Sequence, residues 1–340
     1  MAREMLIIGG AGFIGVNAAD FFVARGWRVS VLDNLSRRGA DRNLDWLRRR
    51  RNVGFTKADI RDAAAMDTTL GERGYDAVLH LAGQVAVTSS VANPREDFEI
   101  NALGTLNVLE AVRRNSPQAA LLYTSTNKVY GKLDDLGVIE RDGRYAYSDA
   151  ADGVGEGRGL DFHSPYGCSK GAADQYTIDY ARIYGLKTTV LRQSCIYGPH
   201  QFGVEDQGWV AWFAIAALLD KPLTIYGDGK QVRDVLHIDD LLAAYAAVFE
   251  QPDAVTGQAF NVGGGPQHTL SLLELIELLQ RRLGKPIAPA FADWRPGDQK
   301  VFVSDIAKLR HATGWQPQIG VTDGVGRLVD WIAENRALFS

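Results

Sequence analysis

MLIIGGAGFIG, residues 5–15, lies near the start of the chain and joins an apolar strand to a glycine-rich turn. A helical pattern from Gly12 to Arg25 follows this turn. Glycines let the chain turn tightly, let a pyrophosphate approach the backbone, and let the helix pack on the strand. The helix start also offers unpaired amides to phosphates. The stretch therefore predicts a dinucleotide site contacted by Gly9, Gly12, Phe13, Ile14 and Gly15.

An acidic residue closes the next predicted strand, Val29–Asp33. Asp33 stands at about the spacing of 20 residues expected of a group that binds the cofactor ribose. A carboxylate there accepts hydrogen bonds from the ribose hydroxyls and repels a 2′-phosphate, which favours NAD over NADP. Arg37 and Arg38 follow and could reach a phosphate, although solvent exposure is their default role. We predict NAD as the cofactor.

Apolar strands and amphipathic helices continue to alternate through the first half of the chain. Further strands are expected near Val53–Lys57, Ala77–Leu81, Leu121–Thr124 and Thr188–Arg192, with helices around 95–114 and 166–184. The alternation predicts an α/β fold with a Rossmann-type, doubly wound parallel sheet over residues 1–192. It decays from about Gln193. We therefore expect residues 193–340 to form a smaller C-terminal α/β region for the substrate, with some segments returning to the first domain.

Ligands bind beyond the carboxyl ends of parallel strands in such folds. Residues at these ends are candidates for cofactor contact: Asn34, Asp59, Ile60, Leu81, Ala82 and Gly83. Gln84 follows them and is a candidate for substrate contact. Ordinary turn chemistry is the alternative for these residues. Residues 131–161 are polar and glycine-rich, and we interpret them as a long loop that covers the substrate side.

Composition excludes several classes of protein. With 46% hydrophobic and 23% charged residues, the chain has the composition of a typical globular protein. Its formal net charge is −4, whereas nucleic-acid-binding proteins usually carry an excess of basic residues. The basic run Arg48–Arg51 reads as the solvated end of a surface helix. Cys168 and Cys195 match no metal-ligand spacing and fit a reducing compartment. No apolar stretch reaches spanning length and no signal-type segment is present, so we expect a cytoplasmic protein without membrane, metal or nucleic-acid partners.

Three residues suggest the chemistry. Tyr166 and Lys170 are spaced i, i+4, which makes them neighbours on a helix whose start is marked by Ser164-Pro165. A phenol is a poor base at neutral pH, but an adjacent ammonium and a positive nicotinamide would favour the phenolate, so both residues should also touch the cofactor. Thr126 follows the fifth strand and would position a substrate oxygen. The alternatives are chance spacing and simple capping of backbone groups.

Together, the glycine motif, Asp33, Thr126, Tyr166 and Lys170 resemble the extended short-chain dehydrogenase family of nucleotide-sugar epimerases and dehydratases. The likeness runs from Met5 to about Trp331. It implies a Rossmann domain with tightly held NAD, a smaller C-terminal substrate domain, and a homodimer formed through the helices near 95–114 and 166–184.

The resemblance extends to one branch of the family. Dehydratases carry an acidic pair after the catalytic threonine, whereas this chain has Asn127 and Lys128, which suit an elimination poorly. Residues 160–176 and 206–210 look like those of the branch that epimerises CDP-hexoses of the paratose and tyvelose type at C2. The resemblance implies transient oxidation to a 2-keto sugar through Tyr166 and NAD, followed by re-reduction on the opposite face, without net consumption of NAD.

The same resemblance suggests residues that contact the substrate besides Gln84 and Thr126. They are Asn127, Cys195, Gln207, Gly208, Trp209, Arg233 and Arg295. The two arginines are candidates for the diphosphate, because a guanidinium fork suits phosphate oxygens. Cys195 stands where many relatives have asparagine. Two other functions stay open: a 4-epimerase of a UDP-sugar, which would use the same three residues, and a non-catalytic NAD-binding sensor.

Overall fold

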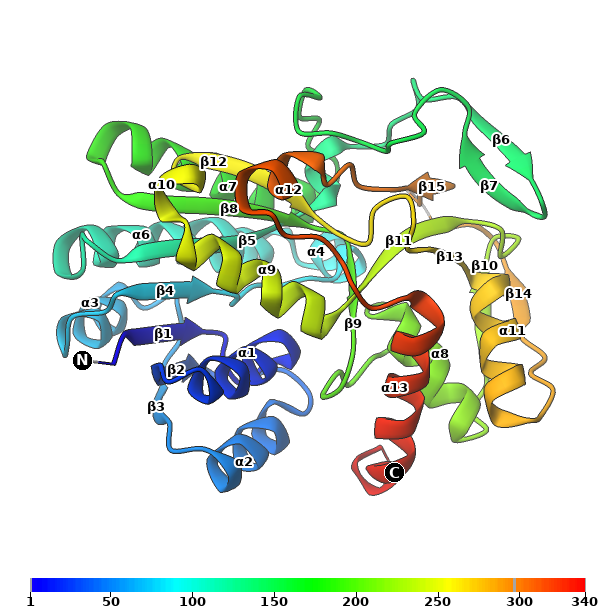
Figure 1. Ribbon diagram of the computed structural model, residues 1–340, viewed down its shortest axis with the longest axis horizontal. Coiled ribbons are helices and arrows are strands. Elements are labelled where there is room, and N and C mark those ends of the chain that lie inside the picture. The colour runs from blue at the N-terminus through cyan, green and yellow to red at the C-terminus, as the bar shows by residue number, and fades with distance from the viewer. Residues whose placement is uncertain (1, 296–297, 340) are drawn as a thin grey trace.

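A computed structural model describes residues 2–295 and 298–339 of the chain (Figure 1). Its largest element is a seven-stranded sheet in the order β12-β8-β5-β4-β1-β2-β3, in which every neighbouring pair is parallel. Its strands are β1 (Glu4–Ile8), β2 (Arg28–Asp33), β3 (Gly54–Lys57), β4 (Ala77–His80), β5 (Ala120–Thr126), β8 (Lys187–Gln193) and β12 (Gln258–Val262). The chain order reverses between β1 and β4, which is where such sheets bind ligands. The predicted fold class is confirmed.

Helices cover both faces of this sheet (Figure 1). One face carries α1 (Phe13–Ala24), α2 (Ala40–Arg50), α9 (Ile238–Glu250), α10 (Pro252–Val255) and α12 (Ala307–Thr313). The other carries α3 (Ala63–Gly71), α6 (Gly104–Asn115) and α7 (Ser164–Tyr184). Strand β1 shows why both layers form: Met5 and Ile7 are buried against the first set, and Leu6 and Ile8 against the second. Alternate side chains of a strand point to opposite faces.

The predicted helix 95–114 is divided. It consists of α5 (Pro94–Phe98), a π-helical turn η1 (Glu99–Leu103) and α6, and the short helix α4 (Val87–Ala92) precedes it. Asn101 is buried in the π turn, where its side chain bonds to the backbone of Gln84. Such local widening of a helix is frequent at functional sites.

A second core lies at the end of the sheet (Figure 1). It is built by α8 (Trp209–Leu218), α11 (Leu272–Leu283) and α13 (Val321–Glu334), with η3 (Arg336–Leu338) after the last helix. Short strands accompany them: β9 (Cys195–Tyr197), β10 (Thr224–Tyr226), β11 (Val232–His237), β13 (Thr269–Ser271), β14 (Ala290–Ala292) and β15 (Val301–Phe302). Between these segments the chain returns to the large sheet, because residues 238–262 supply α9, α10 and the edge strand β12.

The segment 131–161 is not a structureless loop, and that prediction was wrong for its central part. Strands β6 (Val138–Arg141) and β7 (Arg144–Tyr147) form an antiparallel hairpin. Asp142 and Gly143 both have positive φ, 53° and 76°, which is typical of the tight turn that an Asp-Gly pair favours between strands. The hairpin is tied to the C-terminal region: the Tyr145 hydroxyl donates to Asp228 at 2.6 Å, and Arg144 pairs with Glu274 at 2.8 Å.

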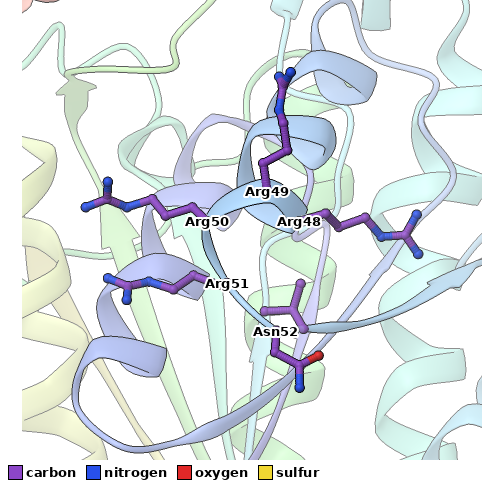
Figure 2. A pocket seen from close by; sticks show the side chains of 6 residues that line it. Arg48, Arg49, Arg50, Arg51 and Asn52 are labelled. Carbon is purple, nitrogen blue, oxygen red and sulfur yellow. The ribbon is translucent and has the colours of Figure 1, made fainter.

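The basic run Arg48–Arg51 ends α2, and Figure 2 shows the side chains of Arg50 and Arg51 on one side while Arg48 and Arg49 point elsewhere. Arg50 and Arg51 pair with Asp20 at 3.0 and 2.6 Å, and Arg48 lies 5.1 Å from the ring centroid of Phe55. The four cations therefore do not converge on a ligand, which confirms the solvated helix end. Within 2–295 and 298–339, no helix combines the length and the apolar character needed to cross a membrane.

Candidate active site

A cavity of about 510 Å³ opens at the carboxyl ends of the central strands. Every residue predicted to bind the cofactor lines it: Gly9, Gly12, Phe13, Ile14, Gly15, Asp33, Asn34, Asp59, Ile60, Leu81, Ala82, Gly83, Tyr166 and Lys170. Gln84 and Gln207, predicted for the substrate, line it as well. The structure thus brings together residues from six segments that are far apart in the chain.

The glycine turn at the cavity packs so closely on neighbouring backbone that it has no space for side chains at Gly9 and Gly15. Gly9 has φ +84°, and a β-carbon there would lie 2.6 Å from the backbone nitrogen of Ala82. A β-carbon on Gly15 would lie 2.3 Å from the carbonyl oxygen of Gly9. Helix α1 starts after Gly12 without a side-chain cap or an acidic residue in its first turn, so its first N–H groups are available to an anion. This turn fits a diphosphate.

Asp33 is held by two backbone groups. Its Oδ2 accepts from the N–H of Ala11 at 3.0 Å, and its Oδ1 accepts from the N–H of Leu35 at 2.8 Å. Burial raises the pKa of Asp33, and these hydrogen bonds oppose the shift. Each carboxylate oxygen keeps acceptor capacity for a ribose hydroxyl. Arg37 stays exposed but bonds to Gln207 of the C-terminal region, so it bridges the two regions beside the cavity. The Asp33 carboxylate is therefore suited to bind the ribose hydroxyls of NAD.

Tyr166 lines the cavity, and Thr126, which does not, lies within hydrogen-bonding distance of the phenol. Tyr166 lies in the first turn of α7, which starts at Ser164 with Pro165 directly after it, and Thr126 is the last residue of β5. Burial raises the pKa of Tyr166 to about 12, and the hydroxyl of Thr126 beside it opposes this shift. The arrangement places a threonine donor next to the phenol that would exchange a proton with a substrate.

Lys170 lies one helical turn beyond Tyr166. Its Nζ donates to the carbonyl of Thr124 at 2.5 Å and lies 4.3 Å from the ring centroid of Tyr123. Burial lowers the pKa of Lys170 to about 7, while the carboxylates of Asp174 and Asp97 oppose the shift. The lysine is thus a buried cation whose charge depends on its neighbours.

A second group of polar residues lies next to Thr126. Lys128 donates to Gln299 at 3.3 Å, and Arg233 pairs with Asp298 at 2.6 Å. Burial lowers the pKa of Lys128 to about 8, and Arg233 adds to this effect. Burial raises the pKa of the Cys195 thiol, which Arg233 and Lys128 oppose. The predicted residues Cys195 and Arg233 are therefore close together, and Lys128, which sequence reasoning had not assigned to the site, lies with them.

The remaining residues predicted for the substrate do not line this cavity. Asn127 accepts from the Thr126 hydroxyl at 3.4 Å. Gly208 caps α8 with φ +72°, and Trp209 begins that helix beside Cys195. Arg295 pairs with Asp206 at 2.9 Å and lies 3.9 Å from the ring centroid of Tyr226. The Arg295 carbonyl accepts from the N–H of Asp298, the residue whose carboxylate pairs with Arg233.

Sequence reasoning also missed Asp97 and Ser169, which hydrogen-bond to each other behind the cavity wall. A signal was present, because Asp97 and Asn101 are spaced i, i+4 and would share a helix face. Only the burial of that face shows that the acid belongs to the site.

Comparison with known proteins agrees with the geometry. Residues 5–263 match the model of the NAD dependent epimerase/dehydratase family. The chain is 47% identical to CDP-paratose 2-epimerase of Salmonella typhi over 96% of this chain and 98% of that protein. The structure resembles UDP-glucose 4-epimerase of Thermotoga maritima with UDP-glucose (TM-score 0.86, 30% identity, covering 98% of this chain and 100% of that chain). It also resembles UDP-glucose 4-epimerase of Thermus thermophilus in complex with NAD (TM-score 0.82, 33% identity, covering 97% and 99%).

Proposed function

The chain belongs to the NAD-dependent epimerase/dehydratase family, and from that premise we propose that it epimerises C2 of a CDP-hexose of the paratose and tyvelose type. The observation that carries the proposal is the position of Tyr166 and Lys170 on the wall of the cofactor cavity, with Thr126 beside the phenol. The choice of a CDP-sugar comes from the 47% identity over nearly the whole chain.

We propose that the cavity residues named above hold NAD, with the diphosphate at the start of α1 and a ribose on Asp33. Bound NAD supplies a hydride acceptor that later returns the hydride. The crowded backbone at Gly9 and Gly15 supports this placement, because side chains there would meet backbone atoms. Since the hydride is returned, no cofactor is consumed.

In the proposed reaction, Tyr166 accepts the proton of the C2 hydroxyl while the C2 hydrogen leaves as hydride. Thr126 donates to the same oxygen and holds it, and Lys170 supports the negative charge on the phenolate. The 2-keto sugar then presents its other face. Tyr166 returns the proton to the oxygen as the hydride returns to C2, so atoms and electrons balance and only the configuration changes.

We propose that the substrate is held by Gln84, Thr126, Asn127, Cys195, Gln207, Gly208, Trp209, Arg233 and Arg295. Arg233 and Arg295 would bind the diphosphate as planar cationic donors. Asn127 and Lys128 argue against dehydration, because neither an amide nor an ammonium can accept the proton that an elimination removes next to the ketone.

We also propose an assembly and a compartment. The division near residue 193, with residues 193–340 forming the substrate region apart from the returning segments, remains our proposal for the domains. Exposed Phe98, Ile183 and Tyr184 on α5 and α7 support a homodimer through these helices. The two free cysteines support a reducing cytoplasm.

The test is incubation of the purified protein in deuterated water, without added NAD, with CDP-tyvelose, CDP-glucose and UDP-glucose in turn. Products are identified by proton NMR. We expect C2 epimers that carry no deuterium at C2, because the hydride returns to the carbon that it left. Deuterium at the inverted carbon would contradict hydride transfer.

A second candidate function is supported by the structural similarity to UDP-glucose 4-epimerase of Thermotoga maritima. Inversion at C4 of UDP-glucose, with no reaction of the CDP-sugars, would favour it. Bound NAD with no turnover of any nucleotide sugar would instead favour a sensor.

A further inference from the structure

Two buried titratable residues interact electrostatically at the cavity: Lys170 lines it, and Asp97 does not. Asp97 on α5 is 1% exposed and Lys170 on α7 is 4% exposed. A charged group in the interior is costly unless another charge or several hydrogen bonds offset it. The question for Asp97 and Lys170 is therefore which neighbouring charges and hydrogen bonds stabilise each charge.

Asp97 accepts hydrogen bonds from neutral donors. The Ser169 hydroxyl donates to its Oδ2 at 2.5 Å, and the Asn101 amide donates to its Oδ1 at 3.1 Å. No arginine, lysine or histidine of the described residues forms an ion pair with it. The other carboxylate near Lys170, Asp174, differs, because Arg192 holds it with two bonds of 2.9 and 3.0 Å. Both carboxylates raise the pKa of Lys170, Asp174 more than Asp97, but Asp97 is the one of the two that forms no ion pair with another residue.

Lys170 is equally short of charged partners. Its hydrogen bond goes to the carbonyl of Thr124, and its other close neighbour is the ring of Tyr123. A β-carbon on Gly83 would lie 3.7 Å from the Lys170 Nζ and 3.0 Å from the Asn101 Oδ1. The ammonium thus lies near the amide that binds Asp97, and Ser169, which also binds Asp97, precedes Lys170 in the chain.

Other titratable groups face Lys170 from each element around it. His80 of β4 has its pKa lowered to about 3 by burial and by Lys170, so it is neutral. Tyr123 of β5 has its pKa raised well above the ordinary value by burial, so it is neutral too. Helix α7 itself contributes Tyr166 and Asp174, and Arg192 of β8 pairs with Asp174. Among these groups, Asp97 alone provides a negative charge without its own cation.

We propose that Asp97 is a positioning residue of the epimerisation: its carboxylate keeps Lys170 an ammonium beside Tyr166 and, through Ser169 and Asn101, fixes the turn of α7 that carries both. Burial alone lowers the pKa of Lys170, to about 7 even with Asp97 in place. Removal of this carboxylate lowers the pKa of Lys170 further, so a smaller fraction of the lysine is charged at neutral pH to support a phenolate. The kinetic part of this inference rests on the proposed function, whereas the charge of Lys170 does not.

The decisive measurement is the titration of Lys170 itself. Protein carrying ε-¹³C-lysine is purified with its bound cofactor, and the Lys170 resonance is identified by its absence in Lys170→Met. In Asp97→Asn we expect the titration midpoint to fall by about one pH unit. The control is Glu96→Gln, which removes a neighbouring exposed carboxylate of α5 and should leave the midpoint unchanged. An unchanged midpoint in Asp97→Asn would overturn the proposal.

Kinetics provide the second readout. We expect the alkaline limb of the kcat profile of Asp97→Asn to move to lower pH together with the Lys170 midpoint, with KM unchanged because Asp97 is not among the residues that line the cavity. A uniform loss of kcat at all pH values, without a shift, would mean that Asp97 is merely structural. If the unaltered protein turns over no nucleotide sugar, the proposed function fails while the NMR titration still decides the relation between Asp97 and Lys170.

Ser169→Ala covers the case in which Asp97→Asn does not fold. It keeps the carboxylate but removes its shortest hydrogen bond, which makes Asp97 easier to protonate. We expect a smaller shift of the Lys170 midpoint in the same direction, and the absence of any shift would count against the proposal.

Discussion

Tyr166 shows how strongly the surroundings control one side chain. Burial raises its pKa to about 12, so the phenol is a poorer base here than in water, and the groups that oppose the shift are the Thr126 hydroxyl and the charge of Arg37. Its catalytic use therefore depends on nearby donors and positive charge. At this scale, chemistry follows from what surrounds an atom rather than from the residue type alone.

Tyr166→Phe should remove the proton acceptor without changing the packing of the ring. We expect kcat to fall by about 10²- to 10⁴-fold, the usual contribution of a positioned acid or base. Bound NAD and the unfolding temperature should stay as in the parent protein, and both are measured alongside the NMR assay. Retained activity would assign the proton to another residue.

Lys128→Met should separate stability from substrate binding. Burial lowers the pKa of Lys128 to about 8, below that of a lysine in the unfolded chain, so the unfolded chain binds more protons between about pH 8 and 10.5. The cost of burying the ammonium is therefore fully present below pH 8 and is relieved as pH rises. We expect the variant to be more stable at pH 7 by on the order of 1 kcal/mol.

This advantage should shrink toward pH 10.5, as urea unfolding at several pH values would reveal. A loss of stability at pH 7 would mean that Gln299 and Asp298 more than offset the cost. Substrate affinity should fall in either case, because the variant removes a cation beside Arg233.

Among the elements, the strand–turn–helix of β1 and α1 depends on backbone proximity. In Gly9→Ala the new β-carbon would lie 2.6 Å from the Ala82 nitrogen, so the turn must move. We expect the affinity for NAD to fall about tenfold or more, which corresponds to about 1.4 kcal/mol. The measurement is the amount of NAD retained after dialysis.

The matched control for this variant is Gly26→Ala. Gly26 has a similar φ, +82°, but its β-carbon would meet no atom within 4 Å. It introduces the same backbone strain without the collision, and NAD should be retained. Equal losses in both variants would attribute the effect to strain alone.

Helix α7 and strand β8 are joined by the buried pair Asp174–Arg192, whose side chains are 0% and 5% exposed. Asp174→Asn leaves a buried guanidinium without its counter-charge, which we expect to destabilise the fold by about 3 to 5 kcal/mol. Chemical unfolding measures this loss. Asp330→Asn, which breaks the exposed pair with Arg282, should leave the unfolding midpoint unchanged. A small effect at Asp174 would mean that water reaches Arg192.

For the whole molecule, the proposed homodimer is open to a direct test. Ile183 on α7 is 65% exposed, an unusual position for a large apolar side chain unless a partner covers it. Ile183→Lys should convert the dimer to monomer in analytical ultracentrifugation. Phe291→Lys alters an equally apolar and exposed side chain, 59%, on β14 and should leave the assembly unchanged. A parent protein that sediments as a monomer would refute the dimer.

The amino-acid sequence by itself determined the parallel sheet, the cofactor turn at Gly9 to Gly15, Asp33 at the end of β2, and the pairing of Tyr166 with Lys170. These features depend on short spacings, which the geometry of strands and helices converts directly into position. The hairpin at 138–147 could also have been predicted from the sequence, because its Asp-Gly turn is a local signal. The many polar residues around it favoured the prediction of a loop instead.

The tertiary structure alone decided which distant residues meet. Lys128 and Arg233 are close in space, as are Asp97 and Ser169, and Arg37 reaches Gln207, although each pair is far apart in the chain. Such contacts depend on how whole layers pack, and the burial that shifts the charge of Lys170 or Lys128 exists only after that packing. The physical reason is that proximity along a helix or strand is fixed by covalent geometry, whereas proximity across the fold is fixed by the packing of every element between.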